Sequence, residues 1–212
     1  MKPRYRQVKL YYSRNLNPRV AVAVARHLKS PVEFIRARPF HPAETEAFRK
    51  LNPNTRVPVL VEGDRSLWEA DAIACRLSEV AGSDFWRRDG EMPEMIKWIS
   101  WAAYHLSNAA RPLYFEWVVK PQVPGHFPPA DPKTLEAPLQ EFKQFAAVLD
   151  EYLKGREWLL DSGLSYADFR VATSLPFAEK AGLPVQDFPN VMRWHGRLLE
   201  IPAWHDPFEG LA

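Results

Sequence analysis

The chain has 212 residues, of which 46% are hydrophobic and 25% charged, a composition typical of a soluble globular protein with one large or two small domains. Its formal net charge of +2 is too small to indicate binding to nucleic acid or to an anionic membrane, and no run reaches the ~20 apolar residues of a membrane span. Because Cys75 is the single cysteine and residues 1–12 lack the apolar core of a signal peptide, the sequence excludes an intrachain disulfide and a cysteine-based zinc site and predicts a cytoplasmic protein.

The first elements of the chain alternate between strand and helix. Residues 7–12 (QVKLYY) and 32–37 (VEFIRA) are predicted strands, rich in β-branched and aromatic residues. The segment 18–28 between them is a predicted helix, with Asn17 as its N-cap and Pro18 at its first position. A strand, a helix and a strand at this spacing favour a right-handed unit in which the two strands are parallel.

The next elements extend this sheet. We predict a short polar helix over residues 43–51, and then two strands, 57–62 and 65–68, joined in a hairpin across Gly63-Asp64. A third helix is predicted over residues 70–80. The last helix ends near Gly82. The order βαβαββα predicts a mixed four-stranded sheet with helices, and hence an α/β domain over residues 1–82.

After Gly82 the pattern becomes all-helical, and we predict a second, all-α domain over residues 91–212. Its first helix, 92–119, contains Pro112, which should kink or break it. A proline-rich loop follows over residues 120–132, and then three predicted helices over 135–153, 165–181 and 191–199. The second of these helices opens with the capping-box pattern Ser165-Tyr166-Ala167-Asp168.

The pair Val57-Pro58 lies inside a predicted strand. Proline has no N–H for the strand ladder, so this position predicts a sheet edge, a bulge or a cis peptide bond, of which we favour the cis bond. We expect Val57 to present its backbone N–H and C=O outward, where a peptide-like ligand can pair with them as an added strand would.

Three motifs are specific in combination: Leu51-Asn52-Pro53-Asn54-Thr55-Arg56-Val57-Pro58-Val59-Leu60, Trp68-Glu69-Ala70-Asp71-Ala72-Ile73 and Leu164-Ser165-Tyr166-Ala167-Asp168-Phe169. In this order and spacing they resemble the soluble glutathione transferases over essentially the whole chain. The resemblance implies a thioredoxin-like N-terminal domain that binds glutathione, a helical domain that holds an electrophilic co-substrate, and a homodimer. It implies no metal and no cofactor besides glutathione as co-substrate.

Such an enzyme stabilises the thiolate of glutathione, and the turn before the first helix is the expected place. Members with a serine here often place it four residues before a helical arginine, and counting back from Arg19 gives Asn15, whose amide can donate. Ser13, Asn17 and Tyr12 are the alternatives. Ser13 and Asn15 are also ordinary turn residues, and Asn17 before Pro18 is also an ordinary N-cap.

The resemblance also assigns residues to the rest of glutathione. Arg56 is a candidate for the glycyl carboxylate, Val57 with Pro58 for backbone pairing, and Glu69 for the γ-glutamyl ammonium. Arg56 is equally consistent with a surface arginine, and Glu69 with a favourable charge at a helix start. Ala70 departs from the family, which usually has serine or threonine there, so weak glutathione binding or another thiol ligand is an open alternative.

The co-substrate pocket is expected to include Tyr12 and residues of the first long helix of the second half. Trp101, Tyr104, His105 and Asn108 follow the spacing i, i+3, i+4, i+7 and therefore share one face of a regular helix. Such a stripe is more often packing between domains than a pocket. His105 on it is more often a structural histidine than a general acid.

The predicted activity is conjugation of glutathione to an apolar or aromatic electrophile. Two other functions stay open: a glutathione-dependent disulfide reductase or peroxidase, and a transferase fold kept as a non-catalytic binding module. The predicted turn contains no cysteine, and Cys75 is expected to be buried in a helix, which disfavours mechanisms that need a protein thiol.

Overall fold

A computed structural model of the chain describes residues 8–39, 41–123, 125, 127–128 and 131–212. The chain divides into two compact units. Unit 1 comprises the residues up to Trp86 together with Ile201–Ala212, and unit 2 comprises Arg87–Glu200. The sequence analysis assigned 201–212 to the helical domain; in the structure these residues, here named the return segment, cluster with unit 1 instead.

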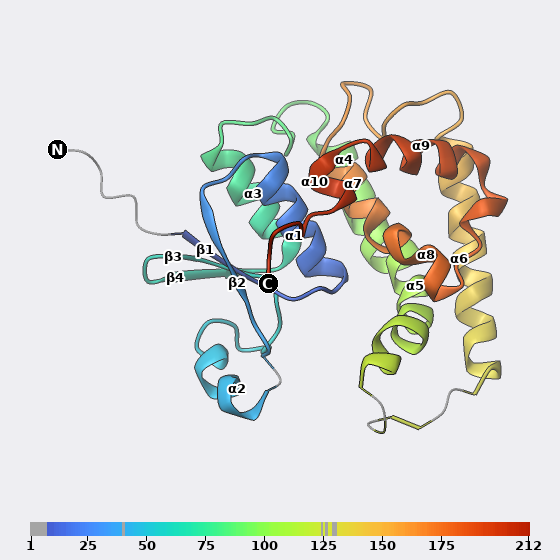
Figure 1. The fold of residues 1–212 in the computed structure, drawn as a ribbon. Helices are drawn as coiled ribbons and strands as arrows, with labels where there is room; N and C mark the ends of the chain where they lie inside the picture. The colour runs from blue at the N-terminus through green and yellow to red at the C-terminus, as the bar shows by residue number, and fades with distance from the viewer. Residues whose placement is uncertain (1–7, 40, 124, 126, 129–130) are drawn as a thin grey trace. The chain divides into compact units, whose positions relative to one another are not determined.

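The predicted parallel pairing of the first two strands and the predicted hairpin of the last two are confirmed in unit 1. Its sheet has the order β2-β1-β3-β4, with β1 parallel to β2 and antiparallel to β3, and with β3 antiparallel to β4. The elements are β1 (Val8–Tyr12), α1 (Leu16–His27), β2 (Val32–Arg36), α2 (Pro42–Arg49), β3 (Val59–Glu62), β4 (Arg65–Trp68), α3 (Ala70–Val80) and α10 (Pro202–His205) (Figure 1). This mixed four-stranded sheet with its helices is the α/β architecture that the sequence predicts.

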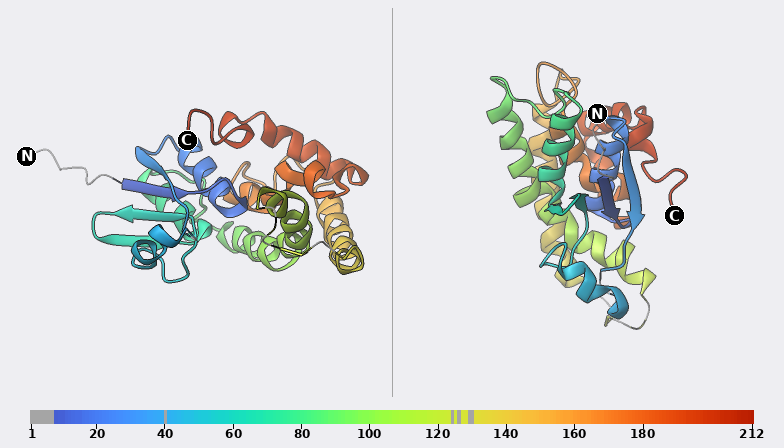
Figure 2. Two further views of the ribbon diagram at one scale, coloured as in Figure 1. Left: turned by 60° about the horizontal axis from the view of Figure 1, so that its bottom comes forward. Right: turned by 90° about the vertical axis from the view of Figure 1, so that its left-hand side faces the viewer.

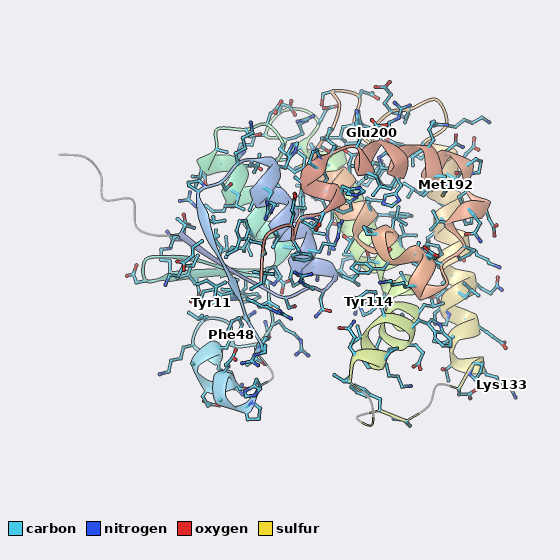
Figure 3. The ribbon with its side chains drawn as sticks, viewed as in Figure 1. Tyr11, Phe48, Tyr114, Lys133, Met192 and Glu200 are labelled. Carbon is cyan, nitrogen blue, oxygen red and sulfur yellow. The ribbon has the colours of Figure 1, made fainter. Side chains whose placement is uncertain are left out.

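Both faces of the sheet are covered, as the alternation along β1 requires. Leu10 and Tyr12 are buried, and α1 packs against α3. On the other face Tyr11 meets Phe48 of α2 edge-on, with ring centroids 5.9 Å apart, beside Val59 (Figure 3). The sheet therefore lies between α1 with α3 and α2, and the loops that join strands to helices are left at its edges (Figure 2).

Helix α1 begins earlier than the sequence analysis placed it. Its N-cap is Asn15, so the prediction of Asn17 as N-cap and Pro18 as first helical residue is wrong. Pro18 is the third residue of the helix, where it is tolerated because the amides of the first turn have no acceptor within the helix. The helix is buried from Pro18 to Ala25, and small alternating residues let it pack closely on both sides.

Unit 2 is all-helical, as predicted. Its elements are α4 (Met92–Trp101), a π turn (Ala102–Leu106), α5 (Ser107–Tyr114), a second π turn (Phe115–Val119), α6 (Lys133–Tyr152), α7 (Tyr166–Val171), α8 (Ala178–Ala181), α9 (Pro189–Leu199) and three 3₁₀ stretches (Lys120–Gln122, Ala172–Phe177 and Val185–Asp187). The helical backbone continues past Pro112, and a π turn follows it. In the part of the chain that the structure describes, none of the helices is both long and apolar enough for a membrane span.

The predicted capping box of α7 is confirmed. The Ser165 hydroxyl accepts from the Ala167 N–H at 3.2 Å, and Asp168 accepts from the Ser165 N–H at 2.9 Å. Asp168 is fully buried and also accepts from the Leu159 N–H (3.0 Å) and the Trp194 indole (2.9 Å). Asp168 is therefore a structural centre of unit 2, as the sequence suggested.

Candidate functional site

The strand registers of unit 1 bring three loops to one edge of the sheet. Tyr11 near the end of β1 pairs with Val59 at the start of β3, so the turn after β1 and the Val57-Pro58 pair before β3 lie at the same end of the sheet. Val59 also pairs with Trp68, the last residue of β4, so Glu69 follows at that end too. The turn before α1, the Val57-Pro58 pair and the start of α3 are therefore neighbours, although they are far apart in sequence.

The turn before α1 holds the candidates for thiol stabilisation. Asn15 is exposed, its carbonyl accepts from the Arg19 N–H at 2.9 Å, and its amide nitrogen donates to the Ser13 hydroxyl at 3.2 Å. Within residues 8–39, the Asn15 side chain makes no capping bond to α1, although it is the N-cap residue. Ser13 and Asn15 thus form one polar pair at the helix start, whereas Asn17 is an exposed residue of the first helical turn.

Tyr12 does not lie where the sequence analysis placed it. Its side chain is 1% exposed and stacks on Phe208 with ring centroids 5.7 Å apart. Its hydroxyl donates to the carbonyl of Ala212 at 2.8 Å. Since the ring is enclosed in unit 1, the assignment of Tyr12 to a co-substrate pocket is corrected to a buried residue of the sheet.

The Val57-Pro58 peptide bond is cis, as predicted. The loop before it is built around Asn52, which is 2% exposed. The Asn52 side chain donates to the Arg56 carbonyl at 2.8 Å and accepts from the Asn54 N–H at 2.9 Å. Arg56 is exposed, and Val57 is half-buried against the cluster around Phe48.

Asn52 is a site residue that the sequence analysis quoted in its motif but did not assign a role. In loops, an asparagine side chain commonly forms hydrogen bonds with the backbone of the turn that follows it, and the Asn-Pro pair is typical of such a turn. That signal was available in the sequence. It sets the shape of the segment that ends at Val57.

The start of α3 has an unusual backbone. Glu69 has φ 74° and ψ 129°, a region that non-glycine residues rarely adopt and that costs about 1–3 kcal/mol. Its carbonyl accepts from the Ile73 N–H at 3.0 Å, while its exposed side chain makes no capping bond to α3 among the described residues. Ala70 behind it is 3% exposed. Glu69 is thus held at the sheet edge with its carboxylate facing outward from the helix start.

In unit 2 the predicted stripe of Trp101, Tyr104, His105 and Asn108 runs through a π turn. The π turn at Ala102–Leu106 closes i→i+5 bonds, which rotates later residues away from the regular helical phase. His105 packs on Phe145 of α6 (4.8 Å between ring centroids), and Trp101 lies 6.2 Å from both rings. Tyr104 is 77% exposed, and His105 and Asn108 are exposed as well, so the shared face of these residues stays a prediction.

A cavity of about 620 Å³ opens between α4 and α6, lined by Lys97, Trp98, Trp101, Val148, Glu151 and Tyr152. Its aromatic walls are fixed by Glu94, which accepts from the Trp98 indole at 3.1 Å and from the Tyr152 hydroxyl at 3.2 Å. Burial raises the pKa of Tyr152 above its usual range. Of the predicted pocket residues, this cavity includes Trp101 alone.

The described residues contain no group of histidine, cysteine, aspartate or glutamate that could hold a metal ion. Cys75 lies in α3, half-buried rather than fully buried.

Comparison with known proteins follows the same division. Residues 6–77 match the model of the glutathione S-transferase N-terminal domain, and residues 110–202 match that of the C-terminal domain. Glutathione S-transferase GstB of Escherichia coli is 30% identical over 192 residues, covering 88% of this chain and 90% of that protein.

Two solved structures have the same fold. Glutathione S-transferase-I bound with lactoylglutathione has a TM-score of 0.84 at 23% identity, over 95% of this chain and 98% of that one. A Pseudomonas putida glutathione transferase with glutathione disulfide has a TM-score of 0.82 at 18% identity, over 99% and 94%. The chain belongs to the glutathione S-transferase family.

Proposed function

We propose that this protein binds glutathione at the sheet edge of unit 1 and joins its sulfur to an apolar or aromatic electrophile. The observation that carries the proposal is the strand pairing that brings the end of β1, the start of β3 and the end of β4 together, next to Ser13, Val57 and Glu69. Relatives with glutathione disulfide or lactoylglutathione bound support glutathione as the ligand. As in the sequence analysis, the protein would be a cytoplasmic homodimer.

Each part of glutathione has a candidate partner in this arrangement. The backbone of Val57 would pair with the cysteinyl unit as an added strand, and the exposed guanidinium of Arg56 would meet the glycyl carboxylate. Glu69 would hold the γ-glutamyl ammonium. The amides at the start of α3 beside Ala70 would face the γ-glutamyl carboxylate, since a helix start favours negative charge.

The thiol would lie at the Ser13–Asn15 pair. The Asn15 amide donates to the Ser13 hydroxyl at 3.2 Å, so these two side chains lie together. Both carry hydrogen-bond donors, the amide N–H and the hydroxyl O–H, that would point to the same thiolate. An N–H or O–H donor stabilises the thiolate more than the thiol, and the start of α1 adds a favourable dipole. Asn17, the second residue of α1, is the weaker candidate.

The reaction is then a nucleophilic substitution or addition. The thiol proton goes to solvent, and the thiolate sulfur forms a bond to the electrophilic carbon. In a substitution the leaving group departs with its electron pair, and in an addition the π bond breaks and its electron pair takes up a proton from solvent. Unit 2 would supply the electrophile's contacts. Tyr104, His105 and Asn108 are favoured over Trp101 because they are exposed, whereas Trp101 is half-buried.

A second candidate is a non-catalytic glutathione-binding module, favoured by Ala70, which supplies no hydroxyl at the start of α3. A disulfide reductase or peroxidase is the third, and it would have to work without a cysteine in the turn. Calorimetric titration with glutathione and a conjugation assay with 1-chloro-2,4-dinitrobenzene separate these functions. Binding with thioether formation supports the transferase, binding without turnover supports the module, and turnover limited to disulfides or peroxides supports the reductase.

A further inference from the structure

The return segment lies against the β1–α1 region at several points close to the Ser13–Asn15 pair. Phe208 stacks on Tyr12, the residue before Ser13, with an angle of 21° between the rings. Phe208 also lies under the guanidinium of Arg14, 5.4 Å from its ring centroid, and Arg14 donates to the Leu211 carbonyl at 3.0 Å. Both neighbours of Ser13 are therefore held by Phe208.

A second anchor lies on the other side of the turn. Arg19, which is 5% exposed, donates to the carbonyl of Trp204 and stacks over the Trp204 indole at 4.5 Å. Burial lowers the pKa of Arg19 to about 10, partly offset by Asp206, so the side chain stays charged at neutral pH. Because the Arg19 N–H also binds the Asn15 carbonyl, this anchor acts directly on the turn.

The turn itself lies at the surface. Arg14 and Asn15 are exposed, and the Asn15 side chain does not cap α1 within the described residues. An exposed turn of this kind samples several backbone conformations unless packing fixes it. A donor displaced by even 1 Å loses much of its effect on a reacting group.

We propose that the return segment is a clasp that holds the Ser13–Asn17 turn in its glutathione-binding conformation, with Phe208 and Arg14 as positioning residues. The proposal rests on the proposed function, because it assigns the clasp to the thiol. It also makes a structural statement that is independent of glutathione: removal of Phe208 loosens the turn and leaves the rest of the sheet unchanged.

The chain offers matched controls. Glu209 is in the same segment and exposed, and it takes part through its backbone carbonyl, so Glu209→Ala leaves the clasp intact. Arg26 also donates to a return-segment carbonyl and lies over the ring of Phe34. It is ten residues beyond Leu16, the first residue of α1, which is about 15 Å along the helix. Arg26→Gln should therefore weaken the segment without affecting the turn.

The first experiment is amide hydrogen exchange of the full chain. Phe208→Ala should speed exchange in residues 13–17 about tenfold, the size expected for losing an aromatic stack and a cation–π contact, with no change in β3 and β4. Phe208→Tyr should behave like the parent protein. If Phe208→Ala does not fold, Phe208→Leu keeps the apolar volume and removes the stacking.

The second experiment is the pH profile of kcat/KM together with the ultraviolet thiolate titration of bound glutathione. Phe208→Ala should lower kcat/KM about three- to tenfold at pH 6.5 and leave it nearly unchanged at pH 9, because the thiol pKa rises. Glu209→Ala and Arg26→Gln should keep the parent profile. A uniform loss at both pH values would overturn the assignment to the thiol.

Unchanged exchange in residues 13–17 of folded Phe208→Ala and Phe208→Leu would overturn the clasp itself. If the parent protein binds no glutathione, the proposed function fails, and the exchange experiment alone then decides whether the clasp exists.

Discussion

The first backbone N–H groups of a helix have no acceptor within the helix, and the starts of α3 and α7 differ in how these groups are satisfied. At α7 the Ser165 hydroxyl and the Asp168 carboxylate occupy the free backbone N–H groups, and both side chains are buried. At α3, among the described residues, no side chain caps the helix, and Glu69 is held at positive φ with its carboxylate exposed. A helix start that is closed by its own residues adds stability, whereas one that is left open can receive an anion.

The largest expected effect is on stability, from a substitution at the capped start of α7. Asp168→Ala leaves the Leu159 and Ser165 amides and the Trp194 indole without their acceptor in a buried position. Each unsatisfied buried donor costs about 1–3 kcal/mol, so the free energy of unfolding should fall by more than about 3 kcal/mol in urea titration. Asp168→Asn, which keeps one acceptor, should lose less. If Asp168→Ala lowers the free energy of unfolding by less than about 1 kcal/mol, the capped start of α7 does not add the stability assigned to it here.

Asn15 at the start of α1 should show the largest effect on activity. Asn15→Ala is expected to lower the conjugation rate about tenfold or more, on the scale of losing one well-placed donor, with little change in stability. Asn17→Ala is the matched control and should retain activity. If Ser13→Ala lowers the rate and Asn15→Ala does not, the hydroxyl rather than the amide is the donor.

Ala70→Ser closes part of the open start of α3. A hydroxyl bonded to a carboxylate contributes about 1.5–3 kcal/mol, of which water replaces some, so we expect glutathione to bind about tenfold more tightly. Calorimetry on both proteins measures the difference, with Ala72→Ser, half-buried in the same helix, as the control. Equal affinity of Ala70→Ser and the parent would mean that the γ-glutamyl carboxylate is already satisfied by other groups.

The smallest expected effect is a difference in pH dependence between the two units. Burial lowers the pKa of His27 in unit 1 below 6.5, so below pH 6.5 the unfolded chain binds a proton that the folded chain resists. This contribution to stability is therefore lost as the pH falls from about 7.5 toward the folded pKa. Burial raises the pKa of Asp168 in unit 2, so its contribution falls instead as the pH rises above 3.8 through the folded pKa.

Urea unfolding at pH 7.5 and 5.5 tests the histidine part. The parent should lose more stability between the two values than His27→Asn, which does not titrate. An equal loss in both proteins would assign the acid sensitivity to other groups.

The sequence predicted those features that depend on neighbouring residues. The β3–β4 hairpin, the cis bond at Val57-Pro58 and the capping box at Ser165 each follow from local patterns, and the structure confirms them. The start of α1 was misplaced because proline is acceptable anywhere in a first turn.

The remaining differences depend on geometry that no local pattern contains. A π turn at Ala102–Leu106 alters the helical phase by a single residue, and no local pattern in the sequence predicted it. The burial of Tyr12 depends on Phe208, which is nearly the whole chain away in sequence. Contacts of that separation are set by the fold as a whole, and spacing along the chain does not reveal them.

The buried amide of Asn52 has a consequence for how a ligand would arrive. Because this side chain bonds both Asn54 and Arg56, the loop that leads to Val57 already has its shape in the protein alone. A ligand that meets a preformed loop loses little free energy to ordering it, and its association needs no slow rearrangement. Stopped-flow mixing with glutathione should therefore show a single phase whose rate rises linearly with concentration, and loosening the loop by Asn52→Ala should appear as a slower, saturating approach to equilibrium.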